Sequence, residues 1–473
     1  MRPRHGKGRA VLNTVSSGFI SQAAEIVGDP YVRRDAASLE TYGVDSLKRG
    51  HPADLVLLPG SAREIAAIAR LCDEARVPLV ARGAGTGYSG GAVPVQGGVV
   101  VSLERLNRIL EIDQDNLLAR VEPNVITGDL QDAVERVGLF YPPDPASLRQ
   151  SAIGGNVAEC AGGPRAFKYG TTRHYVLGLE AVLPTGEIIR TGSKAVKNVV
   201  GYEVTQLLVG SEGTLAIFTE IILRLIPRPP AHATLRVTFR GIAGAVSAVN
   251  ELLSARVVPA AIELIDGECL DAVATYLKTP LAPAGSGAAL VIEVDGMPSH
   301  VEEEVARIEA ACRAASAVEI LRAGTDTERE ELWRVRRELS PSLEVISPIK
   351  FNHDVVVPRG RVPALFDLIA KIRHELRLRI PCFGHAGDGN IHVNIMVDAD
   401  DPDQRRRAHA AERALFEGVI ALEGSISGEH GIGFAKAPYL GLELSPDVIA
   451  LMKRLKRAFD PHGILNPGKI FPD

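Results

Sequence analysis

The chain has 473 residues, of which 46% are hydrophobic and 23% charged, so it is long enough for two or three folded domains. Its formal net charge is −5, and it contains neither a dense basic patch nor an apolar run of membrane-spanning length, which argues against nucleic acid as a partner and against membrane spans. No signal-peptide core follows the basic N-terminus and no cysteines stand at CxxC spacing, so we expect a cytoplasmic protein without disulfide bonds or an iron–sulfur cluster of its own.

The first predicted elements are helices and short strands. Residues 19–28 and 61–76 are predicted as helices, and the segments PADLVLLP (52–59) and VPLVARG (77–83) as strands. Short strands, helices and glycine-rich turns continue to about residue 226, without an internal repeat.

The segment VARGAGTGYSGGA (80–92) is the first that carries chemistry. Gly85, Gly87 and Gly90 match the G-x-G-x-x-G pattern of nicotinamide-binding Rossmann folds, but such a site requires a helix to begin at the loop. The sequence continues instead as AVPVQGGVVVSLERL, whose β-branched run is typical of a strand. The pattern therefore does not indicate a Rossmann site.

The same loop can still bind a diphosphate, because its backbone N–H groups are free of bulky side chains and can surround an anion. Arg82, Thr86 and Ser89 flank those groups. A second loop of similar character, SAIGGNVAECAGG (151–163), follows the segment YPPDPAS. Each loop alone is equally explained as a tight turn, because glycine adopts positive φ freely. Two such loops in one half of the chain favour a ligand.

A proline cluster, LIPRPPAHAT (225–234), marks a domain boundary. Beyond it the pattern predicts an α+β domain in which helices cover one face of a mainly antiparallel sheet. The predicted strands are ATLRVTFR (233–240), AAIELID (260–266), ALVIEVDG (289–296), AVEILRAG (317–324) and IKFNHDVVV (349–357). The predicted helices are residues 301–315, 361–376, 403–422 and 447–459.

The segment FGHAGDGNIHVNI (383–395) places two histidines seven residues apart. Residues 387–390, Gly-Asp-Gly-Asn, favour a turn over a helix, so we predict strand, tight turn, strand, which folds His392 back toward His385. On the second strand one face takes Ile391, Val393 and Ile395, and the other takes His392 and Asn394. Two imidazoles beside an amide indicate part of a polar site.

The fragment GEHGIG (428–433) contains the adjacent residues Glu429 and His430. Two histidines and a carboxylate form a three-ligand set of the kind used in open catalytic metal sites. Zinc fits such ligands best, and manganese and iron(II) bind similar sets. Composition alone does not pair this fragment with the two histidines, and a single histidine is more often a core or surface residue than a ligand.

Seven motifs, in this order, resemble the flavoproteins of the vanillyl-alcohol oxidase type: RGAGTGYSGGA, PPDPAS, IGGNVAECAGG, KNVVGYEVTQLLVGSEGTLAIFTEI, GHAGDGNIHVN, GSISGEHGIG and DPHGILNPGKIF. Within that type they are most similar to the branch of glycolate oxidase catalytic subunits, FAD-linked D-lactate dehydrogenases and D-2-hydroxyglutarate dehydrogenase. The resemblance implies an α+β fold with a PCMH-type FAD-binding domain. The implied divisions are an N-terminal tail (1–18), the FAD-binding domain (19–228), a substrate or cap domain (229–424) and a C-terminal segment that completes both sites (425–473).

By this resemblance, residues 81–91 and 151–163 enclose the FAD diphosphate and ribityl chain, while GSEGTLAI (210–217) and the C-terminal tail approach the flavin. Some relatives attach FAD covalently through a histidine of the first loop, but residues 82–92 contain neither His nor Cys, so FAD is expected to bind non-covalently. The expected FAD-binding residues are Arg82, Gly83, Gly85, Thr86, Gly87, Ser89, Gly90, Pro143, Gly154, Gly155, Asn156, Ala158, Gly162, Gly170, Glu212, Gly213, Ile217 and Asn466.

The resemblance also pairs the two histidine-bearing fragments. It implies that His385, His392 and Glu429 bind one divalent metal and that His430 beside them is the base. Oxidation of a 2-hydroxy acid moves hydride from Cα to flavin N5 and removes the hydroxyl proton. A metal bound to the hydroxyl would lower the pKa of that proton, and a neutral histidine would accept it.

The substrate carboxylate requires a cation, preferably a guanidinium that donates two parallel hydrogen bonds. The resemblance favours Arg336 in WRVRREL (333–339), with Lys350 as a second candidate, and Asn394 as a hydrogen-bonding partner of the substrate. For Arg334 and Arg337 an exposed basic helix face is the simpler interpretation.

We therefore expect an FAD- and divalent-metal-dependent enzyme that oxidises a D-2-hydroxy acid of the glycolate, D-lactate or D-2-hydroxyglutarate type. Electrons would pass to an iron–sulfur subunit, an electron-transfer flavoprotein, a quinone or a cytochrome. The chain would act as a homodimer or with partner subunits, and any membrane association would be peripheral, through a partner.

The alternative is a non-catalytic flavin-binding subunit of a glycolate oxidase-like complex, which would be expected to lack the C-terminal histidines. A flavin-free metal hydrolase would leave both glycine-rich loops unexplained.

Overall fold

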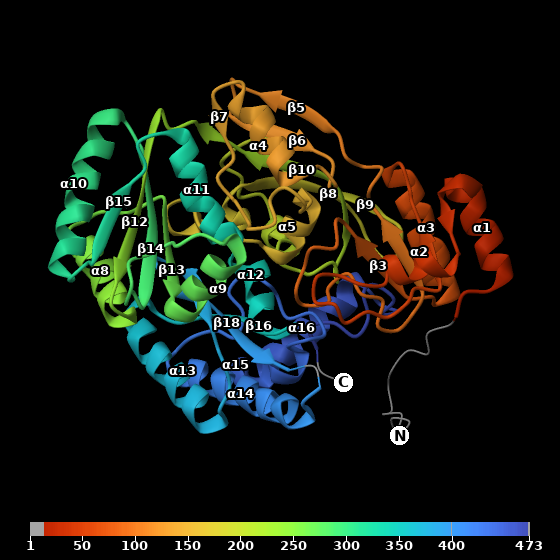
Figure 1. The fold of residues 1–473 in the computed structure, drawn as a ribbon. Helices are drawn as coiled ribbons and strands as arrows, with labels where there is room; N and C mark the ends of the chain where they lie inside the picture. The colour runs from red at the N-terminus through yellow and green to blue at the C-terminus, as the bar shows by residue number, and fades with distance from the viewer. Residues whose placement is uncertain (1–13, 399, 472–473) are drawn as a thin grey trace.

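The computed structural model describes residues 14–398 and 400–471 (Figure 1). The first half of the chain forms two sheets on one side of the molecule, and the second half forms a larger sheet on the other side. Residues 1–13, most of the expected N-terminal tail, lie outside the described residues. No helix within the described ranges is both long and apolar enough to cross a membrane.

The first sheet has the strand order β1-β2-β4-β3, and β2 and β3 both run parallel to β4. The chain passes from β3 to β4 through the first glycine-rich loop and not through a helix, as the sequence predicts. The predicted helices at 19–28 and 61–76 are confirmed, and they pack on this sheet. The elements are β1 (Val32–Arg33), β2 (Leu55–Leu57), β3 (Leu79–Arg82), β4 (Val99–Ser102), α1 (Ser17–Val27), α2 (Ala36–Thr41) and α3 (Ala62–Ala75).

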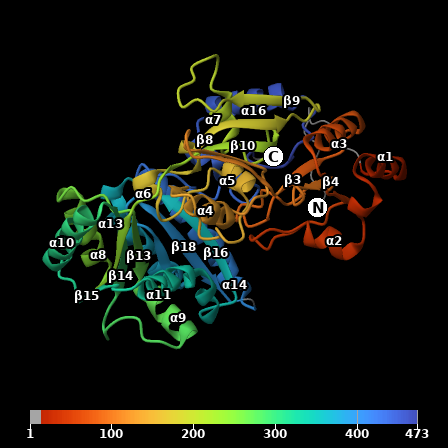
Figure 2. The same ribbon diagram turned by 90° about the horizontal axis from the view of Figure 1, so that it is seen from above.

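The second sheet is antiparallel, with the strand order β5-β6-β10-β8-β9. Helices α4 and α5 contribute apolar side chains to the core beside it. In Figure 2 α5 and α6 lie toward the other half of the molecule, and α6 contacts β13 there. The strands are β5 (Ile109–Asp113), β6 (Leu118–Val121), β8 (Val176–Val182), β9 (Ile188–Gly192) and β10 (Ile217–Arg224), with a separate pair β7 (Leu139–Phe140) and β11 (Ile226–Pro227). The helices are α4 (Thr127–Glu135), α5 (Ile153–Glu159), α6 (Ala166–Tyr169) and α7 (Val204–Leu208).

The third sheet has seven strands in the order β15-β12-β14-β13-β17-β18-β16, and every neighbouring pair is antiparallel. This confirms the predicted α+β arrangement with an antiparallel sheet. The strands are β12 (Ala231–Phe239), β13 (Ala261–Asp266), β14 (Ala288–Gly296), β15 (Glu319–Arg322), β16 (Ile349–Val356), β17 (Cys382–His385) and β18 (Asn390–Val397).

The two faces of this sheet differ in chemistry. On β18, Ile391, Val393 and Ile395 enter the main core, while His392 and Asn394 occupy the other face, as alternation predicts. The core face is covered by α8 (Ile242–Ser254), α10 (Pro298–Ala314), α13 (Val362–Leu376) and α14 (Pro402–Ala421).

The prediction that helices cover only one face is wrong. The second face also carries apolar side chains, among them Ile265, Val291 and Phe383, and these need cover. They pack against α9 (Gly267–Leu277), α11 (Asp326–Arg337) and α12 (Leu339–Ser342). The polar part of this face, which carries His392 and Asn394, belongs to the candidate active site described below.

The C-terminal segment returns to the first sheet. After α15 (Leu440–Glu443) and α16 (Pro446–Phe459), Leu465 lies parallel to Leu79 of β3. The Leu79 N–H donates to the Ile464 carbonyl at 2.8 Å, and the Asn466 N–H donates to the Leu79 carbonyl at 2.7 Å. The end of the described chain thus extends the sheet formed near its beginning.

Candidate active site

His385 and His392 are brought together by the hairpin of β17 and β18. The strands pair antiparallel through the tight turn 386–389, and the two imidazole centroids lie 5.4 Å apart. Gly389 has φ +76°, and a Cβ there would overlap the carbonyl oxygen of Val357, so the turn requires glycine. The predicted strand–turn–strand structure is confirmed.

Glu429 lies against both histidines. Its Oε1 is 3.7 Å from His385 Nε2 and 3.5 Å from His392 Nε2, and the three ligand atoms all lie within 4.8 Å of one another. Bonds of about 2.1 Å in a tetrahedral arrangement place donor atoms about 3.4 Å apart. Two imidazole nitrogens and a carboxylate oxygen at this spacing fit one divalent ion and leave a position for substrate.

The electrostatics of the three residues suit this use. Burial lowers the pKa of His392 to about 3, so its imidazole is neutral. Burial would raise the pKa of Glu429, but His385, His392 and His430 outweigh it and lower this pKa to about 2. Burial would lower the pKa of His385, but Glu263 and Glu429 raise it to about 10, and a metal ion would displace the proton they favour.

A buried carboxylate, Glu263, supports His385 from behind. Its Oε1 lies 2.5 Å from His385 Nδ1, which leaves the other ring nitrogen to face Glu429. Its Oε2 pairs with Arg336, and although burial would raise the pKa of Glu263, Arg336 and His385 lower it to about 2. A carboxylate behind an imidazole ligand fixes the ring in metal sites. Glu263 is not among the residues predicted from the sequence; alternation along AAIELID is the signal that could have found it.

His430, the expected base, lies beside the three ligands. Its Nε2 is 3.8 Å from Glu429 Oε1, and its Nδ1 is 3.4 Å from Asp354 Oδ1. Its ring stacks on His392, with centroids 5.3 Å apart, and on Tyr88, with centroids 5.2 Å apart. Tyr88 belongs to the first glycine-rich loop, so this stack joins the expected flavin side to the expected base. Tyr88 was not predicted, although an aromatic residue inside a glycine-rich loop is a usable signal.

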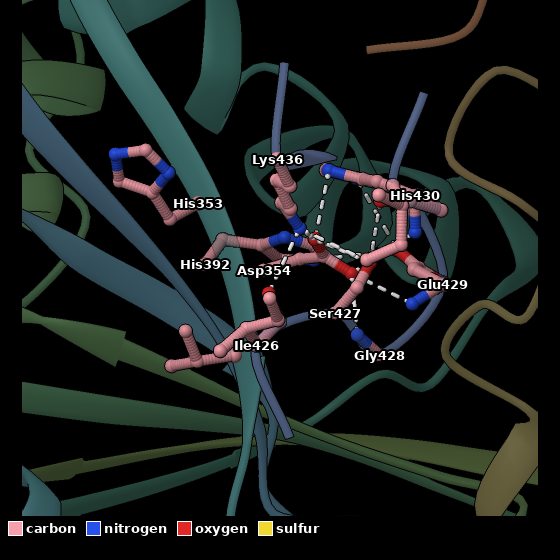
Figure 3. A network of polar contacts seen from close by, with 12 residues as sticks. His353, Asp354, His392, Ile426, Ser427, Gly428, Glu429, His430 and Lys436 are labelled. Carbon is pink, nitrogen blue, oxygen red and sulfur yellow. Dashed lines mark hydrogen bonds and ion pairs between the residues drawn. The ribbon is translucent and has the colours of Figure 1, made fainter. Parts of the chain in front are cut away.

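Asp354 holds the loop that carries Glu429 and His430, as Figure 3 shows. Its Oδ2 accepts the backbone N–H groups of Gly428, Glu429 and His430 at 2.8, 2.6 and 3.0 Å. Its Oδ1 pairs with Lys436. Burial would raise the pKa of Asp354, but His430 and Lys436 hold it far below its ordinary value. This aspartate, too, was not predicted from the sequence.

The same loop is held from the expected flavin side by Glu212. The Glu212 carboxylate accepts the N–H groups of Ile432 and Gly433 at 2.8 and 2.6 Å. Asn466 Nδ2 donates to the carbonyls of Glu212 and Gly91, both at 2.9 Å. Three segments expected around the flavin, those of Gly91, Glu212 and Asn466, therefore meet here beside the loop of Glu429 and His430.

The first glycine-rich loop contains open space and an unpaired polar group. No atom lies within 4 Å of a Cβ added at Gly87, and Gly85 and Gly90 adopt positive φ. Ser89 Oγ is buried without a hydrogen-bond partner in the described parts of the chain. Arg82 points elsewhere, because its Nη1 donates to the Val44 carbonyl at 2.7 Å. Gly83 and Thr86 are half-buried in the same loop.

The second glycine-rich segment is partly helical, which corrects the expectation of a loop. The helix α5 spans Ile153–Glu159, with Gly154 packed on Pro123 and no atom within 4 Å of a Cβ added at Gly155. Asn156 Nδ2 donates to Thr127 Oγ1 at 2.7 Å and so ties α5 to α4. This anchoring outweighs the poor helix propensity of the two glycines.

The remaining expected flavin residues lie around these segments. The Ala158 carbonyl accepts the Glu212 N–H at 2.8 Å, and Gly162 faces the Glu429 carboxylate. The Pro143 carbonyl accepts Gln131 Nε2 at 2.9 Å. Gly170 and Gly213 have positive φ, and Ile217 is buried at the start of β10.

Four buried polar atoms near these segments have no hydrogen-bond partner within the described ranges. They are Ser89 Oγ, Asn124 Oδ1, Glu159 Oε2 and Ser211 Oγ. Buried polar groups in proteins are normally hydrogen-bonded, so these atoms indicate a missing polar partner. Together with the open space before Gly87 and Gly155, they fit a long phosphate-bearing ligand such as FAD. Asn124 and Glu159 are not among the residues predicted from the sequence.

The three residues expected to bind substrate are already held in place. Arg336 is 5% exposed and paired with Glu263. Lys350 Nζ donates to the carbonyl and Oγ of Ser340 at 2.8 and 2.6 Å, and burial lowers its pKa to about 8. Asn394 donates to two backbone carbonyls, and its Oδ1 is buried without a partner among the residues described.

Comparisons with known proteins identify the family of the chain. One family model, the FAD binding domain, matches residues 53–192, and another, the C-terminal domain of FAD linked oxidases, matches residues 228–470. The glycolate oxidase subunit GlcD of Bacillus subtilis (strain 168) is 45% identical over 418 residues, covering 88% of this chain and 89% of its own length. The D-lactate dehydrogenase of Anaerostipes hadrus is 35% identical over 417 residues, covering 87% of this chain and 88% of its own length.

A solved structure supports the fold. Crystalline p-cresol methylhydroxylase with substrate bound superimposes with a TM-score of 0.82 at 18% identity, over 98% of this chain and 99% of the other. At this identity the likeness concerns the fold alone, and it confirms the expected PCMH-type architecture.

Proposed function

The chain belongs to the family of FAD-linked oxidases, and from this premise we propose that it oxidises a D-2-hydroxy acid, or glycolate, to the 2-oxo acid with non-covalent FAD and one divalent metal. The observation that carries the proposal is the cluster of His385, His392 and Glu429 with His430 beside it. Because Tyr88 of the first glycine-rich loop stacks on His430, one substrate could reach the ligand cluster and the flavin site together.

In this proposal His430 is the base. Its Nε2 faces the ligand cluster and would accept the hydroxyl proton of the substrate, while Nδ1 faces Asp354. A divalent ion, when bound to His385, His392 and Glu429, lowers the pKa of that hydroxyl, and FAD, when bound, supplies the acceptor for the hydride. Zinc suits the ligand set best.

Recognition of the substrate carboxylate falls to Arg336 and Asn394. Arg336 uses Nε for Glu263, so the terminal nitrogens of its guanidinium remain for a carboxylate. Asn394 lies two residues after His392 on the same face of β18, and its orphaned Oδ1 could accept from a substrate group. Lys350 is a less direct candidate, because Ser340 already accepts two of its protons.

The electron acceptor is proposed to be a separate partner. The cysteines of the described chain are all free thiols, and four of the five are buried, so they offer no iron–sulfur ligand set. An iron–sulfur subunit, an electron-transfer flavoprotein, a quinone or a cytochrome would complete the turnover.

A substrate panel tests the proposal. The purified protein, loaded with FAD and zinc or manganese, is mixed with glycolate and the D- and L-forms of lactate and 2-hydroxyglutarate, and reduction of an artificial dye is followed. We expect reduction by glycolate or one D-form and little by the matching L-form. A yellow protein that no 2-hydroxy acid reduces would support the non-catalytic subunit, and a protein that does not bind FAD would support a flavin-free hydrolase.

A further inference from the structure

The two carboxylate oxygens of Asp354 have different partners. Oδ2 accepts three consecutive backbone N–H groups, those of residues 428–430. Oδ1 instead faces His430 Nδ1 at 3.4 Å, Ser427 Oγ at 3.4 Å and the ammonium of Lys436. One side chain therefore both fixes the loop backbone and contacts the imidazole that the loop carries (Figure 3).

Asp354 is well placed to do this because it belongs to the sheet and not to the loop. It stands opposite His392 in the ladder of β16 and β18 and is fully buried. The imidazole of His430 stacks on the rings of Tyr88 and His392, while Glu429 lies near its Nε2. Among the described ion pairs, Asp354 is the carboxylate at Nδ1.

We infer that Asp354 is a positioning residue that keeps the proton of neutral His430 on Nδ1 and so leaves Nε2 free to accept the hydroxyl proton of the substrate. The inference rests on the proposed function, in which His430 is the base. A neutral imidazole donates through one nitrogen and accepts through the other, and a carboxylate can only accept. Both ring nitrogens of His430 face a carboxylate, but Nδ1 lies 3.4 Å from Asp354 Oδ1 and Nε2 lies 3.8 Å from Glu429 Oε1, whose lone pairs would be taken by the divalent ion of the proposed function. The nitrogen that faces Asp354 therefore carries the hydrogen.

Replacement by asparagine separates this role from support of the backbone. An asparagine has one acceptor oxygen, which the three loop N–H groups require on the Oδ2 side. Its NH2 group then faces His430 Nδ1, so that nitrogen must accept and Nε2 must carry the hydrogen. Lys436 loses Oδ1 as an acceptor but keeps the Ile426 carbonyl and Ser427 Oγ, both at 3.0 Å. The same exchange at the aspartate of serine proteases, an unrelated fold, leaves the geometry intact and traps the wrong tautomer.

The tautomer can be measured without turnover. In protein labelled with 15N-histidine at alkaline pH, the His430 signals are assigned by their loss in His430→Gln. We expect the Nδ1–H form in the wild-type protein and the Nε2–H form in Asp354→Asn. A wild-type protein in the Nε2–H form would overturn the inference, and this result does not depend on which substrate the enzyme uses.

Kinetics test whether Asp354 acts through His430. Asp354→Asn should slow flavin reduction in a single turnover by about 100- to 10,000-fold, with metal and FAD contents retained and KM changed less than kcat. In a His430→Ala background the same replacement should have no further effect, because the base is already absent. An equal slowing in both backgrounds, loss of metal, or a wild-type rate in Asp354→Asn would overturn the inference. If no 2-hydroxy acid reduces the wild-type flavin, the proposed function fails. The tautomer measurement still shows in that case whether Asp354 keeps the hydrogen of His430 on Nδ1.

Asp266→Asn is the matched control. Asp266 is also a buried aspartate of this sheet; it accepts the backbone N–H groups of Cys269 and Cys382 at 2.9 Å and lies 3.5 Å from Arg373. Its replacement should lower stability as Asp354→Asn does, but it should leave the His430 tautomer and the rate of flavin reduction unchanged. A comparable slowing in Asp266→Asn would show that loss of any buried carboxylate of the sheet is sufficient, and would overturn the inference.

Discussion

The flavin segments and the histidine cluster differ in how their polar groups are satisfied. Around the glycine-rich loops, buried oxygens such as Ser89 Oγ and Ser211 Oγ have no hydrogen-bond partner within the described chain. In the cluster, Glu263 holds His385 and Asp354 holds the loop of Glu429 and His430. The first region needs its ligand to complete its hydrogen bonds, whereas the second is arranged by its own carboxylates. Loss of FAD should therefore leave hydrogen bonds of the flavin segments unmade, whereas loss of the metal should leave the carboxylate contacts of the histidine cluster in place.

The largest expected effect concerns how the flavin region holds its ligand. Because residues 82–92 contain no histidine or cysteine, acid or heat denaturation should release all of the FAD into the supernatant. Absorbance of the supernatant and of the precipitated chain measures the distribution. Flavin that stays with the precipitate would contradict non-covalent binding.

The next effect separates the base from the metal ligands. His430→Ala should slow flavin reduction by roughly 100- to 10,000-fold, the usual contribution of a general base. Both metal and FAD should remain bound, because the three ligands and the glycine-rich loops are untouched. Metal analysis together with stopped-flow absorbance checks this, and a variant that loses its metal would identify His430 as a ligand.

His392→Ala should break the cluster and spare the flavin. The variant should lose the ion and at least ~100-fold in turnover, about 2.7 kcal/mol, while FAD content stays at the wild-type level. His409→Ala, at an exposed histidine of α14, is the control and should match the wild type. Full activity in a metal-free wild-type enzyme would refute the metal's role.

A smaller effect is expected at Glu293, a second buried carboxylate of this sheet that is held by several hydrogen-bond donors. Glu293 accepts from Arg329, Trp333 and Thr234 at 2.7–2.9 Å. Although burial would raise its pKa, Arg329 and the other donors hold it below the ordinary value of 4.5. The contribution of ionised Glu293 to the stability of the fold is therefore complete above about pH 4.5. It is lost as the pH falls toward and through the lowered pKa of Glu293.

Glu293→Gln should lower the free energy of unfolding at neutral pH by about 2 kcal/mol. Its stability should also fall less than that of the wild type below pH 4.5, because the titrating group is gone. Denaturant unfolding at a series of pH values measures both effects. Parallel pH profiles for the two proteins would contradict the assignment to Glu293.

The smallest effect is expected at Ser89, a single hydroxyl of the first glycine-rich loop. Ser89→Ala should weaken FAD binding by about fivefold, about 1 kcal/mol, yet leave the stability of the FAD-free protein unchanged. The reason is that Ser89 Oγ has no partner in the described protein to lose. Ser342→Ala removes a buried hydroxyl that donates to the Leu339 carbonyl at 2.8 Å. This replacement should lower the stability of the FAD-free protein and leave FAD affinity unchanged. Titration calorimetry and thermal unfolding distinguish the two patterns.

Local rules explain what the sequence predicts well. The hairpin of His385 and His392 follows from turn propensity and strand alternation, and the absence of a helix after the first glycine-rich loop follows from the VVV run. Joining Glu429 to the hairpin required a family resemblance, because those segments meet only through tertiary packing.

The missed features depend on neighbours that lie far away in the chain. Alternation places Glu263 and Asp354 on the polar face, but it does not show that one lies behind His385 or that the other accepts three N–H groups of a distant loop. The helix α5 was missed for a similar reason, because its glycines disfavour a helix and the bond from Asn156 to Thr127 is a tertiary contact.

The pairing of Leu465 with β3 also concerns how the protein is made. Leu79 leaves the ribosome about 385 residues before Leu465, a delay of roughly 20–80 s at usual rates of synthesis. During that time the edge of the first sheet lacks its last partner, and the loop that Glu212 anchors has not been made. FAD capture should therefore wait until the loop at 432–433 and Leu465 have been made, and nascent chains stalled before residue 425 should not retain the flavin.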